Sequence, residues 1–125
     1  MQITLYGTAS TTSIRAMSAL DGILDKAVAS AEARKIDPAV LLASRLAPDM
    51  FPLIRQIQIA CDFGKGPMAR LAGIENPKFE DVETTFPELK ARIARVLEFV
   101  RSVLESCFAG ADDRDITLHS VPLTL

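Results

Sequence analysis

The segment RLAPDMFPLIRQIQIACDFGKGPMARLAG, residues 45–73, decides the fold of this 125-residue chain. Pro48 predicts the end of one helix, and Asp49 can cap a new helix that has Pro52 in its first turn. A proline is tolerated there because the first backbone donors of a helix have no intrahelical partner. Gly73 predicts the C-terminus of the new helix. The two prolines therefore mark a junction between two helices.

The new helix has more than one apolar side. Apolar and small residues recur at helical spacing along its core face: Ile54, Ile57, Cys61, Gly64, Met68 and Leu71. Beside that face lies a polar stripe, which consists of Arg55, Gln58, Asp62 and Lys65. Ile59 and Phe63 are four residues apart and fall outside both, so we expect this helix to contact a second partner besides the core. Gly64, Gly66 and Pro67 predict a kink or the close approach of another backbone.

Two helices are expected before this segment. Over residues 13–34 apolar side chains recur every three or four positions, after a Ser- and Thr-rich lead that offers several N-caps. Asp37 followed by Pro38 predicts the start of a short helix that ends near Leu46.

One more long helix is expected after it. Thr85 and Glu88 match the Thr-x-x-Glu capping box, and apolar residues from Leu89 to Cys107 then fall within one broad arc. The last ten residues, ITLHSVPLTL, alternate with period two and predict one or two short strands. The chain is therefore predicted to be all-α: a single domain over residues 1–125, an up-and-down bundle of three long helices and one short helix with antiparallel neighbours, and a short extended C-terminal tail.

Composition excludes several classes of function. Hydrophobic residues make up 49% of the chain and charged residues 24%, which is typical of a globular domain. The formal charge of -2 arises from 16 acidic and 14 basic residues spread along the sequence, so no basic face is available for nucleic acid. No apolar run is long enough to cross a membrane and no secretion signal opens the chain, which predicts a cytoplasmic protein. Two cysteines in such a chain are expected to be free core residues.

Three segments of the sequence resemble a known family. Residues 45–73, followed by ETTFPELKARIARVLEF (83–99) and DRDITL (113–118), resemble a bacterial family of unknown function in the DinB/YfiT-like superfamily of metalloenzymes. The resemblance runs from about Leu5 to Leu118 and implies a four-helix bundle of DinB type. In the better-studied relatives, three histidines from the second and the last helix hold a divalent metal that serves thiol-dependent transfer or hydrolysis.

Two departures from that family bear on function. The chain has a single histidine, His119, so a three-histidine site is impossible. Members of the family continue past the ITL segment into another long helix, whereas this chain ends at Leu125, so the fourth helix of the bundle is expected to be missing. A truncated form of a longer protein stays open as an explanation.

The candidate site residues lie on the central helix. Zinc accepts thiolate, carboxylate and imidazole, but Cys61 and Asp62 are adjacent on a helix and point about 100° apart, which disfavours a site completed by His119. The sequence likewise does not indicate that His119 lies beside Cys61 or Cys107, as a nucleophilic Cys–His pair would require. We therefore expect no metal and no cofactor. The best ligand-binding candidates are the polar stripe and its neighbouring thiol: Arg55, Gln58, Cys61, Asp62 and Lys65. The alternative is a solvated helix face with a weak Asp62–Lys65 pair.

Acidic residues also gather in two loops. One group contains Glu80, Asp81 and Glu83, and the other contains Asp112, Asp113 and Asp115. Neither spacing matches a calcium loop, so both groups are expected to be solvated.

Two functional hypotheses follow. Three amphipathic helices leave an apolar groove where a fourth would pack, which predicts self-association as a homodimer. We expect the faces 54–71 and 89–104 to be buried in the dimer, with Ile59 and Phe63 or the tail reaching the second chain. The first hypothesis is a metal-free module that binds a small ligand or a protein partner. The alternative is a metal- or thiol-dependent transferase or hydrolase in which Asp62 or Cys61 takes part.

Overall fold

The computed structural model describes residues 2–118, and in that range the chain forms helices and no strand. The helices are α1 (Leu5–Ala33), α2 (Pro38–Leu42), α3 (Leu53–Ala72) and α4 (Phe86–Ser102), followed by the 3-10 turns Glu105–Phe108 and Ala111–Asp113. This confirms the all-α class with three long helices and one short one. None of the described helices has a stretch long and apolar enough to cross a bilayer.

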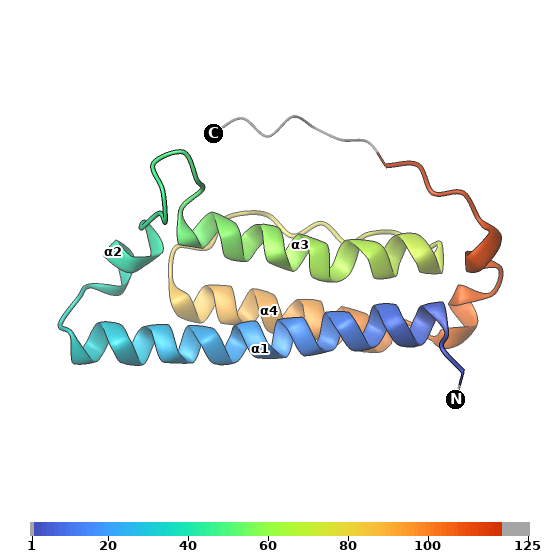
Figure 1. The fold of residues 1–125 in the computed structure, drawn as a ribbon, viewed down its shortest axis with the longest axis horizontal. Helices are drawn as coiled ribbons and strands as arrows, with labels where there is room; N and C mark the ends of the chain where they lie inside the picture. The colour runs from blue at the N-terminus through green and yellow to red at the C-terminus, as the bar shows by residue number, and fades with distance from the viewer. Residues whose placement is uncertain (1, 119–125) are drawn as a thin grey trace.

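The direction of the helices departs from strict alternation. The connection between α3 and α4, residues 73–85, runs back along the whole bundle, so α3 and α4 are parallel to each other and antiparallel to α1 (Figure 1). The connection follows α3 in the opposite direction, since Lys65 contacts Asn76 whereas Gln58 contacts Glu83. It therefore covers the side of the bundle between α3 and α4.

The ends of the first two helices differ from those predicted. α1 starts at Leu5, eight residues before the expected start at Ser13, because the Thr4 hydroxyl accepts a hydrogen bond from Gly7 N and caps the helix there. α2 is capped by Asp37 as predicted, but it ends at Leu42 instead of near Leu46.

The predicted N-cap of α3 is wrong, whereas its predicted C-terminal end is confirmed. Asp49 is not its N-cap: the helix begins at Leu53, with Pro52 in the N-cap position and its carbonyl accepting from Arg55 N and Gln56 N. The predicted end is confirmed, because Gly73 adopts the left-handed conformation with φ of 69°.

Thr85 is the N-cap of α4, as the capping-box motif predicts, but the helix is shorter than its apolar arc. The Thr85 hydroxyl accepts a hydrogen bond from Glu88 N and donates one to the Glu88 carboxylate. α4 ends at Ser102, and the chain then turns so that Phe108 joins the core from a 3-10 turn. Residues 116–118 are not in a strand, and the rest of the predicted strand segment lies outside the described residues.

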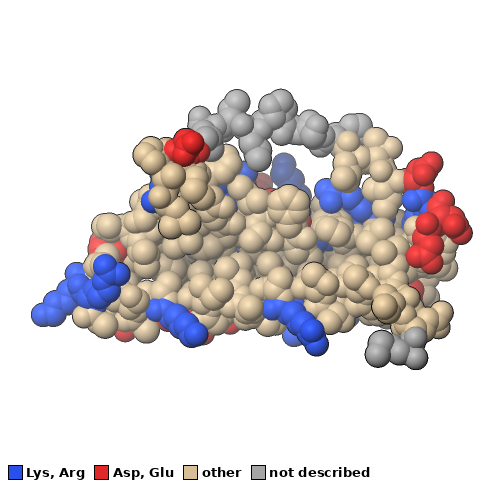
Figure 2. All heavy atoms as spheres, in the orientation of Figure 1, with Lys and Arg blue, Asp and Glu red and all other residues tan. Residues whose placement is uncertain are grey.

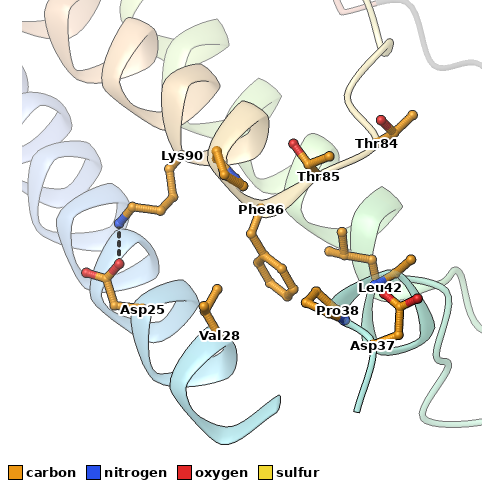
Figure 3. Close-up of a pocket in the computed structure, with 11 residues that line it drawn as sticks. Asp25, Val28, Asp37, Pro38, Leu42, Thr84, Thr85, Phe86 and Lys90 are labelled. Carbon is orange, nitrogen blue, oxygen red and sulfur yellow. Dashed lines mark hydrogen bonds and ion pairs between the residues drawn. The ribbon is translucent and has the colours of Figure 1, made fainter. Parts of the chain in front are cut away.

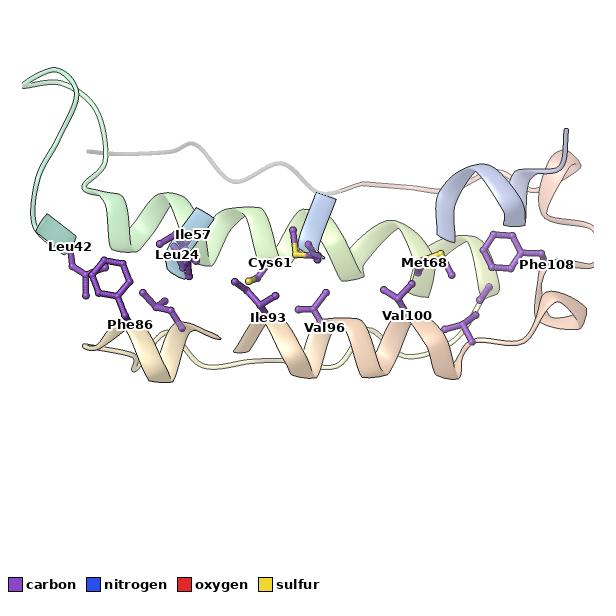
Figure 4. Packing of buried hydrophobic residues seen from close by; sticks show 14 of the residues in the cluster. Leu24, Leu42, Ile57, Cys61, Met68, Phe86, Ile93, Val96, Val100 and Phe108 are labelled. Carbon is purple, nitrogen blue, oxygen red and sulfur yellow. The ribbon is translucent and has the colours of Figure 1, made fainter. Parts of the chain in front are cut away.

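The core lies between α1, α3 and α4 (Figure 4). Its least exposed apolar members are Leu24, Ile57, Cys61, Met68, Leu89, Ile93, Val96 and Val100. The apolar face of α4 is thus buried inside its own chain. The expectation that the face 89–104 would be buried against a second chain is therefore wrong for this face.

At Gly64 of α3 the close neighbours are side chains of α1 and α4, whereas the prediction was the close approach of another backbone. A Cβ atom built there would lie 3.0 Å from Met17 Sδ and 3.2 Å from Val96 Cγ1, and the Ser13 hydroxyl donates to the Gly64 carbonyl. Gly64 therefore sets the spacing of α1, α3 and α4 at the middle of the bundle.

Glycine substitutions test this spacing. Gly64→Val should lower the free energy of unfolding by about 1–3 kcal/mol, because the added methyl groups overpack a filled core. Gly22→Ala is the matched control, since an added Cβ has no atom within 4 Å there; it should stabilise the protein by about 0.5–1 kcal/mol through helix propensity. Urea denaturation measures both, and a Gly64→Val protein as stable as the parent would contradict the close approach.

Candidate functional site

The α3–α4 connection covers part of the polar stripe of α3: Gln58 and Lys65 are buried, Arg55 is half-buried and Asp62 is exposed. Gln58 is buried and its Nε2 donates to Glu83 Oε1 at 3.1 Å. Lys65 is also buried and its Nζ donates to Asn76 Oδ1 at 3.0 Å. Arg55, at the edge, pairs with Asp81 at 2.7 Å. Three of the four stripe residues thus hold the connection against α3.

Arg92 of α4 lies at the centre of this arrangement, with only 1% of its side chain exposed. Its Nη1 lies 2.8 Å from Glu83 Oε1 and 2.9 Å from Asp81 Oδ1, and donates to the Glu80 carbonyl at 3.1 Å. Its Nη2 donates to Asp62 Oδ1 at 3.2 Å. We call Arg92, Asp62, Asp81 and Glu83 the Arg92 cluster. It joins α3, the connection and α4.

The charges in and around the Arg92 cluster balance. The three cations Arg55, Lys65 and Arg92 face the three carboxylates of the cluster. Burial alone would lower the pKa of Arg92, but its hydrogen bond to Glu83 and the charges of the three carboxylates outweigh burial and raise this pKa.

Lys65 behaves differently from Arg92. Burial lowers the pKa of the Lys65 ammonium, and the nearby Asp62 carboxylate only partly opposes this. The side chain also lies over the Phe79 ring, 5.3 Å from its centroid, while Arg95 covers the same ring at 4.0 Å. Two cations therefore help to fix Phe79, and with it the connection, on the bundle.

Cys61 is fully buried beside the Arg92 cluster. Burial raises the pKa of its thiol to about 11, although the Arg92 guanidinium opposes the shift; Asp62 and Glu83 add to it. A nucleophilic cysteine needs an accessible thiolate. Cys61 has neither the access nor the ionisation, so it is a core residue.

The predicted ligand-binding residues are only partly brought to a common surface. Asp62 and Lys65 line a cavity of about 480 Å³ together with Arg70, Asn76, Lys78, Phe79 and Asp81. Gln58 and Cys61 are buried and do not line it. Arg55 does not line it either, although it pairs with Asp81, which does. Ligand binding by these five residues stays a prediction.

The residues do not fit the three-histidine metal site that the resemblance implies. The chain has one histidine, and His119 lies outside the described residues. Asp62 is already paired with Arg92 and Lys65. Within residues 2–118, no three His, Cys, Asp or Glu side chains are grouped so that they could hold a metal ion.

One acidic loop differs from its prediction, and the central cation of the site was not predicted. Glu83 is buried against Arg92, so the expectation that it would be solvated is wrong. Asp81 also pairs with Arg92, but its side chain stays exposed. Arg92 lies between Leu89 and Val96 on the inward face of α4. An arginine at a core position of an apolar arc was the signal that could have found it.

A second feature of the surface is an apolar groove of about 440 Å³ between α1 and α3, the α1–α3 groove. Small residues from both helices line it: Ala9, Thr12, Ala16, Ala60 and Gly64. Phe63 stands at the groove with 75% of its surface exposed. Figure 2 views this side, and uncharged side chains fill most of the middle of the face.

The Arg92 cluster generates a stability prediction. Arg92→Met should lower the free energy of unfolding by about 3–5 kcal/mol, because it leaves Glu83 buried without its cation. Adding Glu83→Gln should recover part of that loss, since the unpaired carboxylate carries much of the cost. The exposed Arg101→Met on the same helix should change stability by less than about 1 kcal/mol. Urea unfolding that gives equal effects for Arg92→Met and Arg101→Met would refute the central role of the cluster.

The Cys61 thiol should make the free energy of unfolding depend on pH in the alkaline range. The unfolded chain releases the thiol proton near pH 9.0, whereas the folded chain keeps it to about pH 11, so the unfolded state binds fewer protons in that window and stability falls as the pH rises. Cys61→Ala should flatten this fall by about 1–3 kcal/mol between pH 9 and 11. Lys65 is present in both proteins, so its own titration cancels in the difference. Parallel stability profiles would contradict the prediction.

Comparisons with known proteins identify the family. The model of a domain of unknown function, DUF1993, matches residues 5–124. A crystal structure of a DinB family member protein from Shewanella denitrificans matches with a TM-score of 0.82 and 48% sequence identity. That match covers 86% of this chain and 61% of the other, so the present chain spans less than two thirds of that protein's length. No curated protein matches the chain. The chain therefore belongs to the DUF1993 family of unknown function and has a DinB-like helical fold.

Proposed function

We propose that this protein is a cytoplasmic, non-catalytic DinB-like bundle that acts as an interaction module and associates with a second copy of itself through the α1–α3 groove. The observation that carries the proposal is the pairing of an exposed aromatic knob with an apolar hollow on one surface. Both cysteines are free thiols, the state that a reducing compartment maintains.

The groove and Phe63 make this surface self-complementary. A two-fold interface joins the same patch of both copies, so the Phe63 ring of each copy must pack into the α1–α3 groove of the other. Phe63 projects from α3, and the groove beside it is lined on the α1 side by the small residues Ala9, Thr12 and Ala16, with Met17 and Met68 at its base. A two-fold axis near the groove can place each Phe63 ring in the partner's hollow, where both lose contact with water.

The alternative, a metal- or thiol-dependent transferase or hydrolase, has less support. It needs Asp62 or Cys61 to take part in the chemistry. The Asp62 carboxylate is engaged by Arg92 and Lys65, and the Cys61 thiol is buried. An engaged carboxylate and a buried thiol are poor metal ligands and poor nucleophiles.

Light scattering coupled to size-exclusion chromatography tests the proposal. The parent protein should have about twice the monomer mass of 13.6 kDa at micromolar concentration. Phe63→Asp should shift it to the monomer, because a carboxylate would be buried in the apolar hollow of the partner.

Val82→Asp is the matched control. Val82 is similarly exposed, at 67%, but lies in the α3–α4 connection, away from the groove. It should leave the dimer intact, and circular dichroism should show that both variants keep the parent's helix content. A parent that stays monomeric, or a dimer that Phe63→Asp does not weaken, would refute the proposal.

A further inference from the structure

A pocket of about 600 Å³ lies at the other end of α1, between α1, α2 and the start of α4. We call it the Lys90 pocket. Its apolar lining includes Val28, Pro38, Ala39, Leu42, Phe86 and Pro87. Figure 3 shows the Phe86 ring pointing into the space between Val28 and Pro38. Its volume is that of sites that bind small organic molecules, and it shares no lining residue with the α1–α3 groove.

Lys90, the single cation among the described residues that line the pocket, has no capacity left for an anionic ligand. An ammonium group has three donors. Lys90 Nζ lies 2.7 Å from Asp25 Oδ1 and 2.9 Å from Asp21 Oδ1, and donates to the Asp21 carbonyl at 3.4 Å. Hydrogen bonds to Asp25 and Asp21 raise the pKa of Lys90, which keeps it charged and paired. All three donors therefore point at oxygens of α1.

The carboxylates of the pocket, in contrast, exceed the cations. Asp25 and Asp37 line it together with Lys90, and Asp21 shares Lys90 from outside. Asp37 uses one oxygen to accept from Ala39 N. Asp25 is 64% exposed, and within residues 2–118 its Oδ1 is the oxygen that pairs with Lys90. The pocket thus has a net negative charge at the edge of an apolar lining.

From this charge pattern we infer that the Lys90 pocket binds a small organic cation, an apolar body carrying one ammonium group. The apolar body fills the space against Phe86 and Leu42, and the ammonium group pairs with Asp25. A carboxylate of the same shape finds no free donor on Lys90 and is repelled by Asp25 and Asp37.

Two probes of equal shape and opposite charge test the inference. Methyl NMR of the full chain is titrated with 4-phenylbutylamine and, separately, with 4-phenylbutyrate. The amine should saturate and shift the methyl signals of Val28 and Leu42, with at least about tenfold higher affinity than the acid.

Variants of residues that line the pocket test where the amine binds and whether the Asp25 carboxylate contributes. Asp25→Asn, at an exposed position, should weaken the amine by about three- to tenfold. It should tighten binding of the acid, because it removes one repelling carboxylate and releases a donor of Lys90. Ala39→Trp fills the pocket from α2 and should abolish amine binding. Val40→Trp is its matched control, because Val40 is the next residue of α2, is 60% exposed and does not line the pocket.

The possible outcomes separate clearly. Equal or tighter binding of the acid, no saturable binding of the amine, or an amine affinity that Asp25→Asn leaves unchanged would each overturn the inference. If Ala39→Trp fails to fold, Asp25→Asn and the comparison of the two probes still decide it. The dimer test at Phe63 is independent of this result.

Discussion

The fold depends on one buried charge, the guanidinium of Arg92. Moving such an ion from water into a protein interior costs several kcal/mol unless carboxylates and hydrogen-bond acceptors replace the lost hydration. Asp62 of α3, with Asp81 and Glu83 of the connection, supply the carboxylates. The cost is offset only when all three segments lie together. A connection of thirteen residues without regular structure, 73–85, is thereby fixed against two helices.

The same constraint determines which surfaces remain open. A bundle of three helices has three grooves on its outside, one between each pair. The connection covers the groove between α3 and α4, and Lys90 bridges α4 to Asp21 and Asp25 of α1 on a second side. The third groove, between α1 and α3, is lined largely by small side chains, and the exposed aromatic ring of Phe63 stands beside it. The surface proposed for self-association is thus a consequence of how the connection returns.

The sequence predicts features that depend on neighbouring residues better than features that depend on residues brought together by folding. Local signals such as the Thr85 N-cap and the left-handed Gly73 act within a few residues, and the structure confirms them. The start of α1 was placed too late because its first turns have few apolar residues, although Thr4 caps the helix and Tyr6 packs against Phe108, more than a hundred residues away. The burial of Glu83 depends on Arg92, nine residues away, once the connection has folded back, and no local pattern contains that information.

The charged groups around Arg92 and those around Lys90 differ in their balance of cations and carboxylates. Around Arg92, three cations meet three carboxylates, and the groups are engaged with one another and with backbone carbonyls. Such a balanced cluster holds segments together and offers little to a ligand. Around Lys90, one ammonium group is shared by two aspartates, and Asp37 adds a further carboxylate beside an apolar pocket. Within residues 2–118, Lys90 is the only cation lining the pocket, so the excess negative charge there remains. A bound cation would neutralise it while its apolar part filled the pocket, so recognition is expected where the charges are unequal and not where they are buried.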